Sequence, residues 1–145
     1  MKLDLPPAEL RSHWEVRVHL LFLGSNDVGP AFDPDELTRT IGVAPTKEWR
    51  VGDPGQLGAP KRTCGWELTS SAGPTAPLSR HIESLLAALS GRESAFAEAA
   101  SRYRVQLECV MYVDAETVSP ELIVPLDQLR ALTDLGISAI GLDIN

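Results

Sequence analysis

The chain has 145 residues, the usual length of one domain, and we expect a single α+β domain over residues 1–145 with residues 1–13 as an N-terminal extension. Its composition, 43% hydrophobic and 23% charged, excludes wholesale disorder and fibrous repeats. Thirteen basic and twenty acidic residues give a formal net charge of −7, which repels phosphate backbones and disfavours general nucleic-acid binding.

The N-terminal residues and the cysteines predict a cytoplasmic protein without a membrane span. Asp4, Pro6 and Glu9 interrupt the apolar stretch that a secretory signal needs, and the longest apolar run, 20–23, is far shorter than the roughly 20 residues that cross a bilayer. The two cysteines have no metal-ligand spacing, so we expect neither a metal nor a cofactor. Both thiols are expected to be buried and reduced, with a disulfide between them as the alternative.

The first predicted elements are a strand over 14–23 and a short helix over 33–41. Apolar and polar residues alternate along the first segment, which is the period of a strand with one buried face. Asp33 and Pro34 provide an N-cap and a proline at the first helical position, and Gly42 provides a C-terminal stop.

A long loop is predicted over 42–61, because its glycines and prolines support no sustained period. It contains a brief extended piece at 49–51. Loops of this length inside a compact domain are usually functional or disordered. Alternation over 63–70 then predicts a second strand.

The second half of the chain predicts helices at 77–90, 93–102 and 125–136, and strands at 103–113, 121–124 and 137–144. A leucine stripe at helical spacing indicates the first of these helices, and prolines open the first and the last. The longest alternating stretch indicates the strand before residue 113, whereas the piece at 121–124 is a short edge strand.

Together these elements indicate an α+β fold: a mostly antiparallel sheet of four to five strands, with helices packed on one face, as a variant of the ferredoxin-like plait. The opposite sheet face carries Glu15, Arg17, His19, Glu67, Arg104, Gln106 and Glu108. A polar sheet face is either solvated or a binding surface, and the sequence leaves both alternatives open.

Residues 47–62 form a basic and aromatic segment in an otherwise acidic chain, with four basic and two acidic side chains. The candidate binding residues in and beside it are Trp49, Arg50, Asp53, Arg62 and Trp66. We expect them to form one cluster, with either arginine against an indole and Asp53 fixing the turn after Gly52. In the structural alternative, both tryptophans close the sheet edge and Arg50 pairs with Asp53.

Short sequence words follow one another in a distinctive order: Asp33-Pro34-Asp35-Glu36-Leu37, Gly42, Pro45-Thr46, Trp49-Arg50-Val51-Gly52-Asp53, Gly65-Trp66-Glu67-Leu68 and, after a leucine-rich helix, Leu135-Gly136 and Leu142-Asp143-Ile144. In order and spacing they resemble the bacterial family catalogued as domain of unknown function 4279, from about residue 14 to the end. In that family a basic residue and Gly-Asp follow the first tryptophan, and a glycine precedes the second. The resemblance supports the fold and the loop, and it implies no activity.

Catalytic signatures are missing from the sequence, which makes an enzyme the less favoured class. No G-x-S-x-G, H-E-x-x-H, G-x-x-x-x-G-K or G-x-G-x-x-G motif occurs. The best candidate for acid–base chemistry is His19 with Glu15 or Glu108 from a neighbouring strand. His81 is expected on the outer side of its leucine-striped helix.

Two functional hypotheses follow from these features. The first is a non-catalytic protein-binding module of immunity or regulatory type, in which the acidic surface steers a protein partner and the aromatic loop anchors it. The second is a small-molecule or anion-binding domain, or an enzyme, with Trp49, Arg50, Arg62 and Trp66 lining a pocket beside the sheet.

Overall fold

The computed structural model describes residues 14–25, 27–113 and 122–145, and the predicted N-terminal extension lies outside these ranges. Within them, one curved sheet contains five strands in the spatial order β2 (Lys47–Trp49), β3 (Cys64–Thr69), β1 (Trp14–Gly24), β4 (Val105–Val113) and β5 (Ile140–Ile144). Neighbouring strands are antiparallel except β4 and β5, which run parallel. The predicted α+β class and mostly antiparallel sheet are therefore confirmed, and the ferredoxin-like plait stays a prediction.

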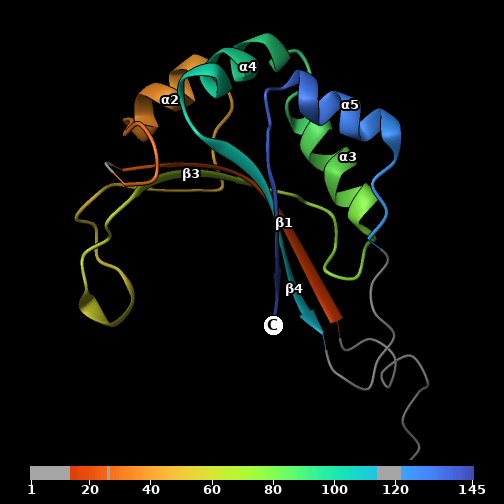
Figure 1. The fold of residues 1–145 in the computed structure, drawn as a ribbon, viewed down its shortest axis with the longest axis horizontal. Coiled ribbons are helices and arrows are strands. Elements are labelled where there is room, and N and C mark those ends of the chain that lie inside the picture. The colour runs from red at the N-terminus through yellow and green to blue at the C-terminus, as the bar shows by residue number, and fades with distance from the viewer. Residues whose placement is uncertain (1–13, 26, 114–121) are drawn as a thin grey trace, which may run out of the picture.

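The α-helices of the described ranges lie on the convex side of the sheet (Figure 1), whereas the short 3₁₀ helix η1 (Gln56–Gly58) belongs to the loop between β2 and β3. The α-helices are α2 (Pro34–Ile41), α3 (Leu78–Ala88), α4 (Glu93–Arg102) and α5 (Leu126–Asp134). α2 begins as predicted, because the Asp33 side chain accepts a hydrogen bond from the Asp35 backbone N–H. It ends at Gly42, whose φ of 78° lies in the left-handed region that favours glycine. None of these helices is long and apolar enough to cross a membrane.

Two predicted strand positions need correction. The extended piece near 49–51 is β2, which lies two residues earlier, because Arg50 already begins a turn in which its carbonyl accepts the Asp53 N–H at 3.1 Å. The edge strand predicted at 121–124 is wrong for residues 122–124, which belong to no strand; residue 121 lies outside the described ranges. The leucine and isoleucine of that segment are both exposed, so their apolar character reflects no buried strand face.

The core lies between the convex face of the sheet and the helices. Phe22 of β1 contacts Trp66 and Phe96 with ring centroids 5.7 and 5.2 Å apart. Cys64 and Cys109 are both buried and form no disulfide, as expected. Burial, together with the charge of the adjacent Glu108, raises the pKa of the Cys109 thiol to about 11.

Candidate functional site

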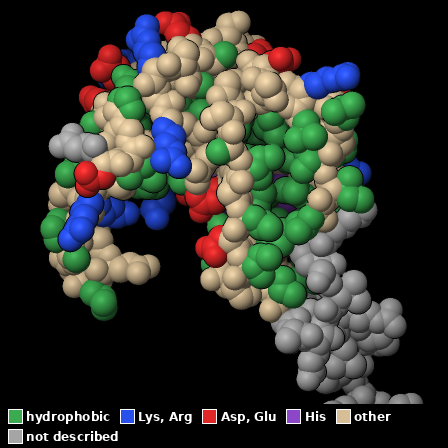
Figure 2. Space-filling model, viewed as in Figure 1, with side chains coloured by type: hydrophobic (Ala, Val, Ile, Leu, Met, Phe, Trp, Pro, Cys, Tyr) green, Lys and Arg blue, Asp and Glu red, His purple; other side chains and the backbone are tan. Residues whose placement is uncertain are grey.

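The helix-free face of the sheet is concave, and we call this surface the trough. Because side chains alternate along a strand, register places the following residues on it: Lys47 and Trp49 from β2, Glu67 and Thr69 from β3, Glu15, Arg17 and His19 from β1, and Gln106 and Glu108 from β4. Lys and Arg side chains stand along one side of the trough, its basic wall, and Asp and Glu side chains lie across from them (Figure 2). The predicted polar sheet face is thus a concave, charged surface.

A hollow of about 770 Å³ in the trough is lined by residues of β1, β2 and β3, by the segment that follows β3 and by His81 of α3. Its charged lining consists of Glu15, Arg17, Lys47 and Glu67, with His19 among them. This volume falls within the about 300–1,000 Å³ of typical small-ligand sites. The hollow can therefore hold either a small molecule or a few side chains of another protein.

His19 lies at the middle of the trough. It stands opposite Thr69 on β3 and opposite Glu108 on β4. Its Nδ1 shares a hydrogen bond of 2.9 Å with Thr69 Oγ1. The expected neighbourhood of His19 and Glu108 is thus present, but no hydrogen bond joins the two side chains among the described residues. Glu15 is instead 3.8 Å from the Arg17 guanidinium, so neither predicted acid–base pair has formed.

His81 is buried beneath the same hollow, and its predicted place on the outer side of α3 is wrong. Only 1% of the residue is exposed, and Nδ1 shares a hydrogen bond of 2.9 Å with Ser70 Oγ. Nε2 has no hydrogen-bond partner within the described part of the chain. Burial lowers the pKa of His81, nearby carbonyls of Ala76 and Gly73 partly offset this effect, and His19 lowers the pKa further. The segment after β3 wraps over this imidazole, a contact that helical periodicity alone does not reveal.

Trp49 forms the aromatic part of the basic wall. Lys47 and Lys61 place their ammonium groups 5.6 and 4.7 Å from the indole centroid, within the range of cation–π contacts. The indole nitrogen donates to Thr63 Oγ1 at 3.2 Å. Beneath the ring lies Gly65, where any side chain would collide with the indole. The partners of Trp49 are lysines on both sides of the loop, whereas the prediction was an arginine.

Trp66 lies on the other face of the sheet, which makes the predicted single cluster of two tryptophans wrong. Gly65 stands opposite Trp49 in the ladder, so the next residue, Trp66, points to the helices. It is fully buried, and its indole nitrogen donates to Thr38 Oγ1 of α2 at 3.0 Å. Trp66 is therefore a core residue that joins β3 to α2.

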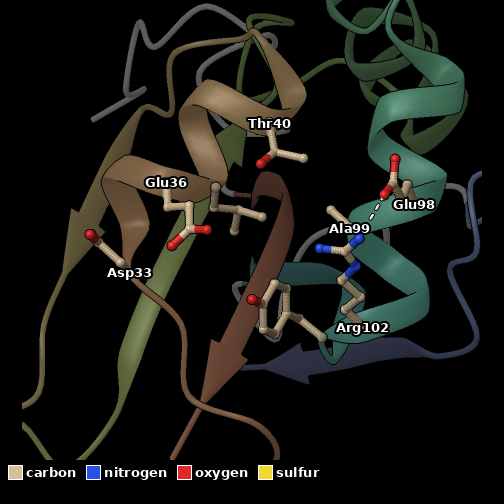
Figure 3. A pocket seen from close by; sticks show the side chains of 8 residues that line it. Asp33, Glu36, Thr40, Glu98, Ala99 and Arg102 are labelled. Carbon is tan, nitrogen blue, oxygen red and sulfur yellow. Dashed lines mark hydrogen bonds and ion pairs between the residues drawn. The ribbon is translucent and has the colours of Figure 1, made fainter.

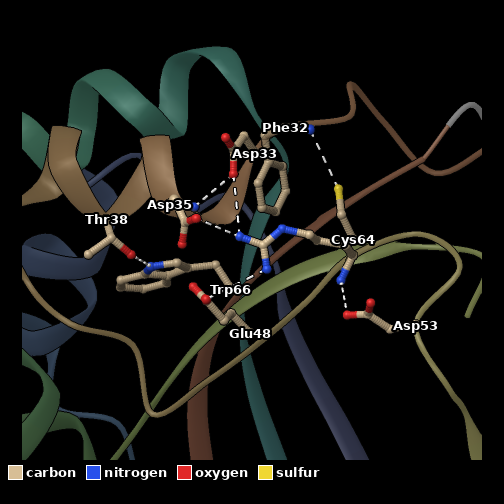
Figure 4. Close-up of polar contacts among 9 residues, drawn as sticks. Phe32, Asp33, Asp35, Thr38, Glu48, Asp53, Cys64 and Trp66 are labelled. Carbon is tan, nitrogen blue, oxygen red and sulfur yellow. Dashed lines mark hydrogen bonds and ion pairs between the residues drawn. The ribbon is translucent and has the colours of Figure 1, made fainter.

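Arg50 ties the loop to the beginning of α2 through Asp33 and Asp35, which are labelled in Figure 4. Its guanidinium lies 2.8 Å from Asp35, 3.6 Å from Asp33 and 3.8 Å from Glu48. The hydrogen bond and charge of Asp35 raise the pKa of Arg50. The Arg50 backbone N–H donates to Asp53 Oδ2 at 2.7 Å, so Asp53 holds the turn as predicted.

Arg62, the other predicted arginine, is exposed and lies with Lys61 beside a second hollow of about 520 Å³, whose lining also includes Asp27 and Val51. Neither arginine stacks on an indole in the described structure, because the cations over Trp49 are the two lysines. Of the five predicted residues, only Arg50 and Asp53 are joined by a hydrogen bond. The Trp49 indole lies on the trough face, whereas the Arg50 guanidinium lies at the beginning of α2 on the other side of the sheet.

A small cavity between α2 and α4 offers no ligand site (Figure 3). Its volume is about 20 Å³, and Glu98 and Arg102 form an ion pair of 2.8 Å at its rim. That space suits about one water molecule. Across the described ranges, no group of three or more His, Cys, Asp or Glu side chains could hold a metal ion.

Comparison with known proteins gives one match. A family model described as Domain of unknown function (DUF4279) matches residues 14–145, which is nearly the whole chain and includes every strand and helix described above. No curated protein and no solved structure matches the chain. The short sequence motifs around Trp49 and Trp66 lie within the matched range.

Proposed function

Because the chain belongs to the DUF4279 family, a domain family of unknown function, its role has to be argued from the trough, and we propose that it is a non-catalytic, protein-binding module of immunity or regulatory type. The trough would take up a segment of a partner protein that carries charges of both signs. The observation that carries the proposal is the presence of charges of both signs on one concave face, with Lys47 and Lys61 beside Trp49 and the carboxylates of Glu67 and Glu108 further across the sheet. Charges arranged in this way favour one orientation of a partner and speed its approach.

The charges of the trough are available to a partner. In the described structure Lys47, Lys61, Glu67 and Glu108 take part in no ion pair, although Lys47 and Glu67 stand opposite each other in the ladder. The basic wall around Trp49 suits an acidic side chain, and the two glutamates suit a basic one. A tryptophan that is held in place by Gly65 and Thr63 loses little conformational freedom on binding, which favours an anchoring role.

Two features support a non-catalytic role. The Nδ1 of His19 is occupied by its hydrogen bond with Thr69 Oγ1, and among the described residues no carboxylate is hydrogen-bonded to the imidazole. The Ser70–His81 contact lies below the surface, since His81 is almost completely buried. A general base has to reach the proton that it removes, and neither histidine meets this need together with an orienting acid.

The experiment compares the wild-type chain with Lys61→Glu, which reverses the charge 4.7 Å from the Trp49 ring. Each protein is immobilised and exposed to cytoplasmic extract, the captured partner is identified and purified, and its binding is then measured at low and high salt. We expect Lys61→Glu to weaken binding by about tenfold or more, with a smaller salt dependence than the wild type shows.

The matched control is Arg39→Glu, which makes the same charge change at an exposed position of α2 on the convex side. This variant is expected to bind like the wild type, because only the charge of the trough matters. Equal binding by Lys61→Glu and the wild type would contradict the proposal, as would equal losses in both variants.

A small anionic ligand is the second candidate, and the volume of the trough hollow favours it. A ligand at a hundred times its dissociation constant would stabilise the protein by about 2.7 kcal/mol. A thermal-shift screen of phosphate, sulfate and small carboxylates should then raise the melting temperature of the wild type and of Arg39→Glu, but not of Lys47→Glu, which reverses a charge in the lining of that hollow. No shift with any of these anions would leave the protein-binding proposal as the one supported.

A further inference from the structure

β5 forms an outer edge of the sheet and exposes an unusual number of apolar side chains. Ile140, Leu142 and Ile144 are 50%, 53% and 61% exposed. Their register partners on β4 are buried, so these three side chains point to the side of the sheet that the helices cover elsewhere. One face of β5 is thus as apolar as the buried faces of the inner strands, but in the described structure this face is exposed.

The apolar surface continues beyond the strand. Ile123 and Leu126, just before and at the start of α5, are 59% and 62% exposed. Hydrophobic side chains gather around a hollow between β5 and the helices α3 and α5 (Figure 2). Contiguous apolar patches of this kind mark interaction sites in proteins that are otherwise polar outside.

The free edge of β5 also carries unused backbone groups. Leu107 N–H donates to Ala139 C=O at 3.1 Å, and Asn145 N–H donates to Met111 C=O at 2.8 Å, so the odd-numbered residues of this strand bond to β4. By alternation, the N–H and C=O groups of Ile140, Leu142 and Ile144 point outward. The residues with exposed apolar side chains are therefore the ones with outward hydrogen-bonding groups.

We propose that β5 pairs antiparallel with β5 of a second copy of this chain, which joins the two sheets into one. A two-fold axis through the middle residue places Leu142 opposite Leu142 of the second copy, and Ile140 opposite Ile144. All three pairs exchange outward N–H and C=O groups, and their side chains form one continuous apolar row. On the trough face, Asp143 stands opposite Gly141, so no two carboxylates oppose each other.

The pattern of the two sheet edges favours a second copy at β5 and not at β2. β2 is three residues long and carries Lys47 and Glu48, and charges on a short edge strand discourage pairing. β5 has the same apolar pattern in both directions from Leu142, which is what an isologous interface requires. Stable interfaces bury about 1,200–2,000 Å², more than a short strand supplies, so the exposed side chains at the start of α5 join the interface.

The mass of the full chain in solution tests this arrangement. The weakest interfaces of standard size have dissociation constants in the micromolar range, so a protein concentration of about 100 μM should populate the dimer. At this concentration, light scattering after gel filtration should give twice the 15.7 kDa of one chain. Leu142→Lys places a charge at the two-fold axis and should shift the mass to that of a monomer. The control Val51→Lys changes an apolar side chain of similar exposure, 59%, far from β5 and should remain a dimer. Circular dichroism confirms that each variant is folded.

A second measurement tests the register without depending on the lysine variant. Hydrogen-bonded antiparallel partners have Cα atoms about 5.5 Å apart, within the range that a disulfide spans. Under mild oxidation Leu142→Cys should form a covalent dimer, whereas Val51→Cys should stay largely monomeric; the native cysteines are buried. A monomeric wild type at all concentrations would overturn the proposal, as would a dimer that survives Leu142→Lys or fails to cross-link through Leu142→Cys. Neither readout depends on the proposed function of the trough.

Discussion

At the scale of single residues, Gly65 and Trp66 of the Gly65-Trp66 dipeptide are each required for a different physical reason. Gly65 lies beneath the Trp49 indole on the trough face, where a side chain would collide with the ring. Trp66 points the other way and fills the core against Phe22. One dipeptide thus supports the proposed binding surface with its first residue and the hydrophobic core with its second.

Gly65→Ala should displace the Trp49 ring and destabilise the protein by about 1–3 kcal/mol, the usual cost of forcing a methyl group into an occupied space. Urea unfolding, followed by tryptophan fluorescence, measures both effects. Gly73→Ala is the control, because a Cβ there meets nothing within 4 Å, and it should change stability by less than about 0.5 kcal/mol. An unchanged fluorescence spectrum and midpoint for Gly65→Ala would contradict the packing of Trp49 on this glycine.

His81 makes stability depend on pH, because its folded-state pKa is lowered mainly by burial and also by His19. The unfolded chain therefore takes up the proton first as the pH falls, which favours unfolding. The unfolding free energy should be constant above about pH 7 and decrease below the unfolded-state pKa of about 6.5, by at most about 1.4 kcal/mol per pH unit for this one proton. The charged groups lining the same hollow are Glu15, Arg17, Lys47 and Glu67.

The test is urea unfolding of the wild type and His81→Gln between about pH 7.5 and 5.5, where titration of the carboxylates contributes similarly to both proteins. The glutamine variant should be less stable at the higher pH and have the flatter curve. Parallel curves for the two proteins would show that His81 does not titrate differently on folding.

At the scale of elements, the leucine stripe of α3 holds this helix against the sheet. Ile82 is fully buried, Leu85 is 1% exposed, and Leu89 at the C-cap of the helix is fully buried. The end of the helix that begins at Leu78 also carries His81 and reaches the segment after β3. α3 thus contributes both to the core and to the underside of the trough.

Leu85→Ala should lower the unfolding free energy by about 2–5 kcal/mol, the range for a truncated core leucine. The comparison is Val51→Ala in the loop after β2, where the side chain is 59% exposed and its truncation should cost less than about 0.5 kcal/mol. Denaturant unfolding measures both variants. A loss below about 1 kcal/mol for Leu85→Ala would mean that α3 does not cover the sheet in this way.

At the scale of the whole molecule, the described α-helices and the three inner strands of the sheet share one hydrophobic core. Its buried residues come from three of the five strands and from all four α-helices. The three tryptophans report on different places: Trp14 begins β1, Trp49 lies in the trough and Trp66 lies in the core. A chain that folds as one domain loses all three environments together.

Urea unfolding followed by tryptophan fluorescence and by far-ultraviolet circular dichroism should therefore give coincident transitions with one midpoint. Fluorescence senses the surroundings of the indoles, and circular dichroism senses the helices and strands. Separate midpoints would contradict one cooperative domain over residues 1–145. Trp49→Phe removes the fluorescence of the tryptophan in the trough. The unfolding midpoint that Trp14 and Trp66 then report by fluorescence should still equal the midpoint from circular dichroism.

Local sequence patterns determined, for most of the helices and strands, that they exist and of which type they are. Caps, prolines and apolar periods act over a few residues, so α2, α3, α4, α5 and four strands were predictable within a few residues. The basic aromatic segment was also visible, because Lys47, Trp49 and Lys61 are near one another along the chain. The family words added the extent of the domain, from about residue 14 onward.

Only the tertiary structure decided how these pieces face one another. The ladder of β2 and β3 separates Trp49 from Trp66, the carboxylates at the start of α2 bind Arg50, and the segment after β3 buries His81. Each of these contacts depends on strand register or on chain segments that meet across the fold. Local periodicity shows that a strand has two faces, but the strand's neighbours determine which face becomes core and which becomes the trough.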